Sequence, residues 1–293
     1  MNTPAVEIRG LRRHFARFAL GPVDMTVPTG QIYGLIGPNG AGKTTLLDLI
    51  FGMGQPNAGT IRVLGLDHER DAVAMKRRTA YASPDLSFAA WGRVGAALAF
   101  VRGFHAGWDA GYAARLLREF HLREEDKVIS LSFGARMKLA LLLALAWRPE
   151  VLVLDEPTTG LDAESRRLVF AELLRLVQDE GRTVLISSHQ IADLERFADH
   201  VGILHNGMML HEGPLPELTD RWRLVDFSHA LNGSLTSAPG FLIQKSSAGR
   251  ARAVVDVAKH PLASLAARGL TDVSAVPLPL EDLFIELTRE EQP

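Results

Sequence analysis

The sequence contains no cysteine, which excludes disulfide bonds, a thiolate nucleophile and any zinc site built on cysteine. It also lacks a long hydrophobic run. The longest, LALLLALAW, covers Leu139 to Trp147, about half the length that a membrane-spanning helix needs. A formal net charge of -2 gives no excess of positive charge for binding nucleic acid through bulk electrostatics. We therefore expect a protein that binds no nucleic acid and reaches a membrane only through a partner.

The hydrophobic pattern predicts an α/β core. Short, fully apolar runs end in polar residues, as parallel strands buried on both faces do; they are 31–37, 151–154 and 183–187. The segment 163–180 has the amphipathic pattern of a crossover helix and stops at Gly181. From about 85 to 150 the pattern is helical, so we expect a helical subdomain inserted into this core.

Past Gly213 the pattern changes to short pieces, with a hairpin around 241–257 and a final helix at 280–288. We expect two parts: residues 1–213 as the main domain, and 214–293 as a small accessory α+β region. Within the main domain, 201–210 predicts a hairpin with an Asn-Gly turn.

A phosphate-binding loop follows the first buried strand. GPNGAGKT, Gly37 to Thr44, satisfies the pattern G-x-x-x-x-G-K-[ST] between a predicted strand and a predicted helix. Glycines let backbone N–H groups approach phosphates, Lys43 reaches the terminal phosphates and the Thr44 hydroxyl is suited to Mg²⁺. The alternative, a glycine-rich turn with a solvated lysine, does not explain this context. The predicted nucleotide-binding residues are Gly37, Pro38, Asn39, Gly40, Ala41, Gly42, Lys43, Thr44 and Thr45.

Two adjacent acids end the strand 151–154. Asp155 is placed to hold Mg²⁺, and Glu156 to act as general base on a water that attacks the terminal phosphate. The alternative is a pair of helix N-cap residues before Pro157. His189, at the end of the next strand, is a candidate contact to the terminal phosphate, whereas a lone strand-end histidine is more often structural. The three residues together favour a catalytic site with Lys43.

The order of these motifs resembles the nucleotide-binding subunit of ABC transporters over about residues 5 to 215. GPNGAGKTT resembles the Walker A motif of this family, VLVLDE its Walker B and His189 its switch histidine. LSFGA, Leu131 to Ala135, resembles its signature motif, and TGLD, Thr159 to Asp162, its D-loop. Phe15 falls where the family has an aromatic that stacks on adenine, although a core phenylalanine is the competing interpretation.

The resemblance implies a P-loop NTPase fold of the ABC type, with a helical subdomain, an antiparallel β subdomain and ATP with Mg²⁺ as cofactors. It implies that two subunits pack head to tail, as a homodimer or heterodimer. Ser132 and Gly134 of each would then contact the γ-phosphate held by the other, and Asp162 would link the two sites. It further implies a separate transmembrane permease and a peripheral position on the cytoplasmic face of the plasma membrane.

The sequence departs from the family pattern at three positions. Phe133 and Ala135 replace the Gly and Gln of the commonest signature, and Asp85 stands where the Q-loop usually has Gln. Aspartate is itself a suitable Mg²⁺ ligand, so Asp85 is carried over as a candidate. Four aromatic side chains of the helical insertion would either contact the permease or pack between the helices of the insertion itself. They are Trp91, Phe100, Phe104 and Trp108.

The resulting hypothesis is an ATPase subunit that powers a bacterial exporter of a drug, peptide or antibiotic-like substrate. The alternative is an ATP-switched regulatory protein without a role in transport. The sequence does not identify the substrate, because the transported molecule contacts the permease. The role of 214–293 also stays open, between a dimer contact, a docking site for a regulator and simple packing.

Overall fold

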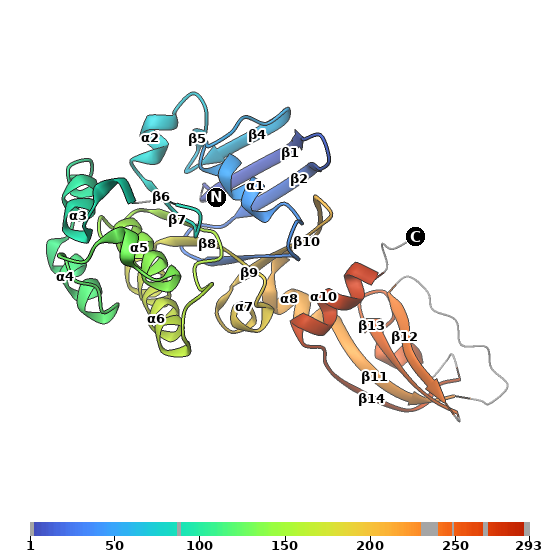
Figure 1. The fold of residues 1–293 in the computed structure, drawn as a ribbon. Coiled ribbons are helices and arrows are strands. Elements are labelled where there is room, and N and C mark those ends of the chain that lie inside the picture. Colours follow the sequence, from blue (N-terminus) through green and yellow to red (C-terminus); the bar gives the residue numbers. More distant parts are fainter. Residues whose placement is uncertain (1–2, 87–88, 230–239, 248, 266–268, 290–293) are drawn as a thin grey trace. The chain divides into compact units, whose positions relative to one another are not determined.

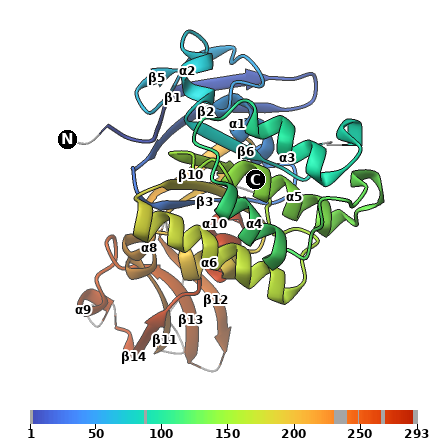
Figure 2. The same ribbon diagram turned by 90° about the vertical axis from the view of Figure 1, so that its left-hand side faces the viewer.

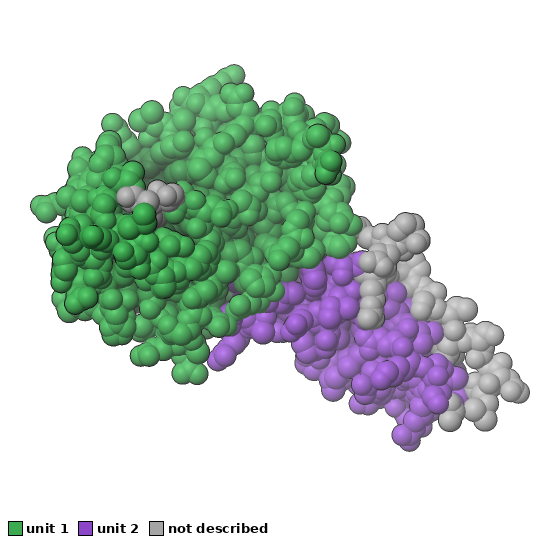
Figure 3. All heavy atoms as spheres, in the orientation of Figure 1, with its two compact units in different colours: residues 1–190, 197–212 green, residues 191–196, 213–293 purple. Residues whose placement is uncertain are grey.

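The computed structural model of the chain describes residues 3–86, 89–229, 240–247, 249–265 and 269–289. These residues form two compact units (Figure 3). Unit 1 comprises residues 1–190 and 197–212, and unit 2 comprises residues 191–196 and 213–293. Each unit has a hydrophobic core of its own.

A six-stranded sheet forms the centre of unit 1, in the order β10-β9-β3-β8-β7-β6. Its strands are β3 (Ile32–Ile36), β6 (Thr79–Ala82), β7 (Val151–Leu154), β8 (Thr183–Ser188), β9 (His200–His205) and β10 (Met208–Pro214). Every residue of β3, β7 and β8 is buried, and each pairs in parallel with its neighbours. Helices cover both faces of such a sheet, which explains the unbroken apolar runs that predicted these strands.

A second, antiparallel sheet has the order β2-β1-β4-β5. Its strands are β1 (Val6–His14), β2 (Ala19–Val27), β4 (Ala58–Val63) and β5 (Leu66–Asp67). Helix α1 (Lys43–Ile50) lies against this sheet (Figure 1). Its Leu46, Leu47 and Ile50 share one core with the buried side of β1 and β2. This core fixes the start of α1, where the phosphate-binding loop ends.

The helical subdomain lies between β6 and β7 in the sequence. It contains α3 (Val94–Arg102), α4 (Ala110–Glu119) and α5 (Phe133–Leu145), which Figure 2 shows grouped together, and the 3₁₀ turns Ala89–Trp91 and Val128–Ser130. Helix α2 (Ala72–Lys76) precedes β6. The second half of α5 is buried all round, as its LALLLALAW sequence predicted. No helix in the described part of the chain is both long and apolar enough to cross a membrane.

Helix α6 (Ala163–Glu180) connects β7 to β8 and ends at Gly181, whose φ of 63° makes it a left-handed C-cap. The turn between β9 and β10 contains Asn206 and Gly207, both with positive φ (47° and 78°). Both features follow from local sequence and were predicted from it. Helix α7 (Ile191–Phe197) follows β8, and its first six residues belong to unit 2.

Unit 2 contains a four-stranded antiparallel sheet, in the order β12-β13-β11-β14. Its other elements are helices that flank the strands. The elements are α8 (Leu215–Arg221), β11 (Trp222–Ser228), β12 (Phe241–Ser247), β13 (Arg250–Asp256), α9 (Leu262–Leu265), β14 (Thr271–Pro277) and α10 (Leu280–Arg289). The predicted hairpin is the antiparallel pair β12–β13. Inside the unit, the Glu195 carboxylate accepts a hydrogen bond from the Leu280 backbone N–H at 3.0 Å.

Candidate active site

The segment from Gly37 to Thr45 joins β3 to α1, and its glycines are closely packed against neighbouring residues. Gly42 has a φ of 105°, and a Cβ added there would lie 2.7 Å from Cζ of Phe18. A Cβ on Gly37 would lie 2.3 Å from the carbonyl oxygen of Leu204. Only glycine fits these two positions, and the absence of side chains leaves the backbone N–H groups at the helix N-terminus open to an anion.

Lys43 is buried, with 6% of its side chain exposed. Its Nζ donates to the carbonyl oxygen of Gly37 at 2.7 Å and lies 3.3 Å from Oε1 of Glu156. The lysine therefore bridges the loop and the acid that follows β7. This buried ammonium, which also donates to the Pro38 carbonyl oxygen at 3.4 Å, is placed to exchange these partners for phosphate oxygens.

Asp155 and Thr44 meet directly. The Thr44 hydroxyl donates to Oδ2 of Asp155 at 2.6 Å, although the two residues are 111 positions apart in the sequence. The Ser187 hydroxyl donates to Oδ1 of Asp155 at 2.5 Å. Hydroxyl and carboxylate oxygens are the donors that Mg²⁺ prefers, so this pair fits a magnesium ion shared with phosphates.

Glu156 is held in an unusual backbone conformation, with a φ of 46°. Its N–H donates to the Ser187 hydroxyl at 2.9 Å, and its Oε2 lies 2.7 Å from Nδ1 of His189. Ser187 thus contacts both acids, a role that the sequence did not predict. Its only signal in the sequence was a polar pair, SS, at the end of a strand that is otherwise apolar.

A cavity of about 540 Å³ opens over this loop. It is lined by Arg17, Phe18, Pro38, Asn39, Gly40, Gly42, Lys43, Thr44, Thr45 and Glu156. Arg17 and Phe18 were not predicted. Phe15, the predicted adenine-stacking residue, is not among these lining residues; its ring is 47% exposed and stacks on Phe18 at 6.2 Å between centroids.

The Asp85 side chain is exposed, and its own N–H is held by the Ser83 hydroxyl at 3.2 Å. Asp85 contributes to the electrostatics around Asp48, on the first turns of α1. Burial raises the pKa of Asp48, the charges of Asp155 and Asp85 add to the rise, and a hydrogen bond from Tyr81 opposes it. The proposed role of Asp85 as a metal ligand stays a prediction.

The LSFGA segment caps α5 and does not line the cavity over its own loop. Ser132 is the N-cap residue, with its hydroxyl accepting from the Ala135 N–H at 3.2 Å. Asp162 caps α6 in the same way, since its Oδ1 accepts from the Ser165 N–H at 2.8 Å. The hydrogen bonds that Asp162 accepts from the Ser165 N–H and from the Ser165 hydroxyl lower the pKa of Asp162. The structure therefore brings Lys43, Thr44, Asp155, Glu156 and His189 together, and leaves Ser132, Gly134 and Asp162 outside that cluster.

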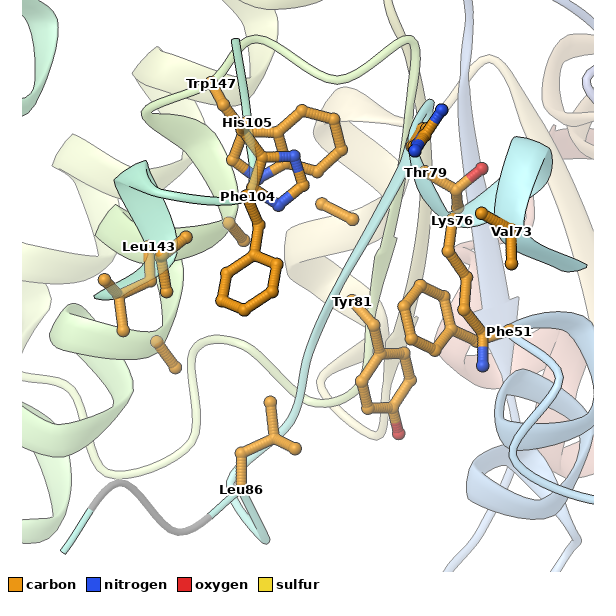
Figure 4. A pocket seen from close by; sticks show the side chains of 15 residues that line it. Phe51, Val73, Lys76, Thr79, Tyr81, Leu86, Phe104, His105, Leu143 and Trp147 are labelled. Atoms are coloured by element: carbon orange, nitrogen blue, oxygen red, sulfur yellow. The ribbon is translucent and has the colours of Figure 1, made fainter. Parts of the chain in front are cut away.

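An apolar groove of about 550 Å³ lies elsewhere on unit 1, lined by residues of the helical subdomain and of the core. Figure 4 shows Phe104 and Leu143 on one side, with Tyr81 and Phe51 on the other. His105 stacks on Trp147 at 3.9 Å between ring centroids, and burial lowers the pKa of His105. Of the four aromatic residues singled out in the insertion, Phe104 lines this groove.

Comparison with known proteins gives consistent matches. The family model described as ABC transporter matches residues 20–159. The Nod factor export ATP-binding protein I of Burkholderia lata is 35% identical over 73% of this chain and 72% of that protein. The daunorubicin/doxorubicin resistance ATP-binding protein of Streptomyces peucetius is 32% identical over 74% of this chain and 67% of that protein.

A solved structure of an ATP-binding subunit of an ABC transporter has a TM-score of 0.65. It is 27% identical and covers 74% of this chain and 92% of that chain. These matches confirm the α/β architecture that the order of the motifs predicted.

Proposed function

The chain belongs to the ABC transporter family of ATPases, and from that premise we propose that it is the ATP-hydrolysing subunit of a bacterial exporter. One observation carries the proposal: Lys43, Thr44, Asp155, Glu156 and His189 converge on one phosphate-binding loop, although they come from three segments of the sequence. The relatives named for Nod factor export and for drug resistance support export as the direction of transport.

ATP binds in the cavity over Gly37–Thr45, with its phosphates on the loop N–H groups and on Lys43. Thr44 and Asp155 hold Mg²⁺, with Asp85 as a further ligand. The bound Mg²⁺ supplies positive charge to the β- and γ-phosphates. Phe15 stacks on adenine, a role supported by its exposed ring beside Phe18, which lines the cavity.

Glu156 is the general base, and His189 orients its carboxylate through the 2.7 Å contact to Nδ1. Before ATP binds, Oε1 of Glu156 faces Lys43 at 3.3 Å. The triphosphate competes with Glu156 for the lysine, because it brings several negative charges where the carboxylate has one. Binding thus frees the carboxylate to take a proton from the attacking water.

A second ATPase subunit completes the site. None of the residues 131–135 lines the cavity over the loop of its own chain, and Ser132 is exposed at the N-terminus of α5. A helix N-terminus binds phosphate when one is brought to it. In a head-to-tail dimer, Ser132 and Gly134 contact the γ-phosphate of the partner subunit, and Asp162 links the two sites.

The permease is a separate chain that docks in the apolar groove. The groove presents aromatic and aliphatic side chains to solvent, including Phe104, which is 68% exposed. Lys76 and Arg77 lie on its lining and favour a docked helix that carries an acidic residue. This contact places the chain on the cytoplasmic face of the plasma membrane. Residues 214–293 form an accessory region, as the separate core of unit 2 supports.

Glu156→Gln tests the proposal. Mg-ATP should still bind, and turnover should fall by roughly 10²–10⁴, the usual contribution of a general base. The matched control is Glu150→Gln, which makes the same change at the other end of β7, where Glu150 pairs with Arg78 at 2.6 Å. Turnover of Glu156→Gln close to that of Glu150→Gln would refute the assignment of the base.

A further inference from the structure

The start of α5 and the turn before α6, both in unit 1, meet at Gly160. A Cβ added to Gly160 would lie 2.4 Å from Cδ1 of Phe133, and a Cβ added to Gly134 would lie 2.6 Å from the Gly160 carbonyl oxygen. Real Cβ atoms do not approach other heavy atoms this closely. A side chain on Gly160 would therefore displace the Phe133 ring, and a side chain on Gly134 would displace the backbone of the turn before α6.

The turn that Phe133 covers is connected to the general base. The Thr159 N–H donates to the Glu156 carbonyl oxygen at 3.1 Å, and the Leu161 N–H donates to the Thr158 carbonyl oxygen at 3.2 Å. Gly160, between them, has a φ of 75°. Contact with the Phe133 ring therefore acts on a short hydrogen-bonded turn that runs directly from Glu156 to Asp162.

Each segment is also fixed at its helix end. Ser132 caps α5 and Asp162 caps α6, each through a hydrogen bond within its own helix. Phe133 is 42% exposed, so it lies at the surface of the chain, and the Cδ1 and Cε1 atoms of its ring lie against Gly160. Phe133 stands where the commonest signature motif of the family has glycine, which could not make this contact.

We propose that Phe133 is a positioning residue whose ring joins the turn 159–162 to the start of α5. As a result, Ser132, Gly134 and Asp162 form one preformed surface for the second subunit. A preformed surface lowers the ordering cost of association. That consequence rests on the proposed head-to-tail dimer; the contact within the chain does not.

Hydrogen exchange in the nucleotide-free chain tests the contact. Phe133→Ala removes the ring and keeps a good helix former at the start of α5. We expect the amides of Thr159 and Leu161 to exchange about tenfold faster in this variant, because their turn opens more often. Phe133→Leu, which keeps an apolar side chain, should show a smaller increase. Exchange at Thr159 and Leu161 that is unchanged in Phe133→Ala would overturn the proposal.

ATP-driven dimerisation in a Glu156→Gln background tests the consequence. Phe133→Ala should raise the Kd of the dimer about tenfold and leave the nucleotide affinity of the monomer unchanged. Faster exchange with an unchanged dimer Kd would overturn the positioning role. If the parent Glu156→Gln chain binds Mg-ATP and never dimerises, the proposed head-to-tail dimer is refuted, and the positioning role of Phe133 is refuted with it. The hydrogen-exchange result would still show whether the Phe133 ring holds the turn 159–162.

The glycines provide a cross-check, in which the effect of the ring is the difference between backgrounds with and without it. Gly160→Ala should weaken dimerisation, because its positive φ disfavours alanine and the added methyl group collides with the Phe133 ring. The factor lost should be smaller in the Phe133→Ala background, where that collision is absent. Gly134→Ala is the matched control, since its methyl group meets a backbone oxygen and removing the ring gives no relief. Equal losses from Gly160→Ala with and without the ring would contradict the proposal.

Discussion

At the scale of single residues, the backbone of Glu156 is the least ordinary feature of the site. A left-handed conformation costs a non-glycine residue roughly 1–2 kcal/mol. Here Ser187 holds the N–H of Glu156, and His189 holds its carboxylate. The sequence predicted the acids, because a polar pair after an apolar strand is a local pattern. It could not predict Ser187 or Phe18 as members of the site, because their contacts join segments that are far apart in the chain.

Lys43→Ala should abolish detectable ATP binding. The change removes the buried cation that faces both the loop carbonyl and Glu156, and no other lysine lines the cavity in the described part of the chain. The measurement is the affinity for a fluorescent ATP analogue. Lys127→Ala, a lysine remote from the loop in sequence, is the control and should bind normally. Unchanged affinity in Lys43→Ala would refute the phosphate site.

At the scale of elements, a polar network joins α4 of the helical subdomain to α6. Glu172 on α6 is buried and accepts hydrogen bonds from the Tyr112 hydroxyl at 2.7 Å and from Arg115 at 2.8 Å. The pattern of α6 predicted its length and its end, but it did not predict a buried acid. Burial works to raise the pKa of Glu172; the hydrogen bonds from Arg115 and Tyr112 outweigh it, so the pKa is lowered.

Glu172→Gln should therefore destabilise the protein in a pH-dependent way. Because folding lowers the pKa of Glu172, its stabilising contribution is present at neutral pH and is lost as the pH falls through the lowered value. We expect a loss of about 2 kcal/mol in the free energy of unfolding at neutral pH, typical of hydrogen bonds to a buried charge. Unfolding by urea at neutral and at acid pH measures it. A loss of the same size at both would contradict the charged network.

At the scale of the whole molecule, the account depends on a site made by two chains. The order of motifs predicted this arrangement through family resemblance. The structure adds that Ser132 and Gly134 lie outside the cavity over their own loop. The apolar groove could not be predicted, because its lining combines residues from Phe51 to Trp147 that only the fold brings together.

Two inactive variants should complement each other. Ser132→Arg and Lys43→Ala each disable both sites of a homodimer. A mixed dimer keeps one intact site, in which the Ser132→Arg chain supplies the loop with Lys43 and the Lys43→Ala chain supplies Ser132. An equal mixture forms mixed dimers half of the time, so turnover should recover to about a quarter of the normal value. Turnover in the mixture no higher than in the separate variants would show that Ser132 acts within its own chain.

The most direct test of the central claim is the mass in solution of the Glu156→Gln chain, with and without Mg-ATP. The account predicts a monomer alone and a dimer with Mg-ATP, because ATP joins the loop of one subunit to the Ser132 segment of the other and the variant cannot hydrolyse it. A chain that binds Mg-ATP and keeps the mass of a monomer would contradict the composite site.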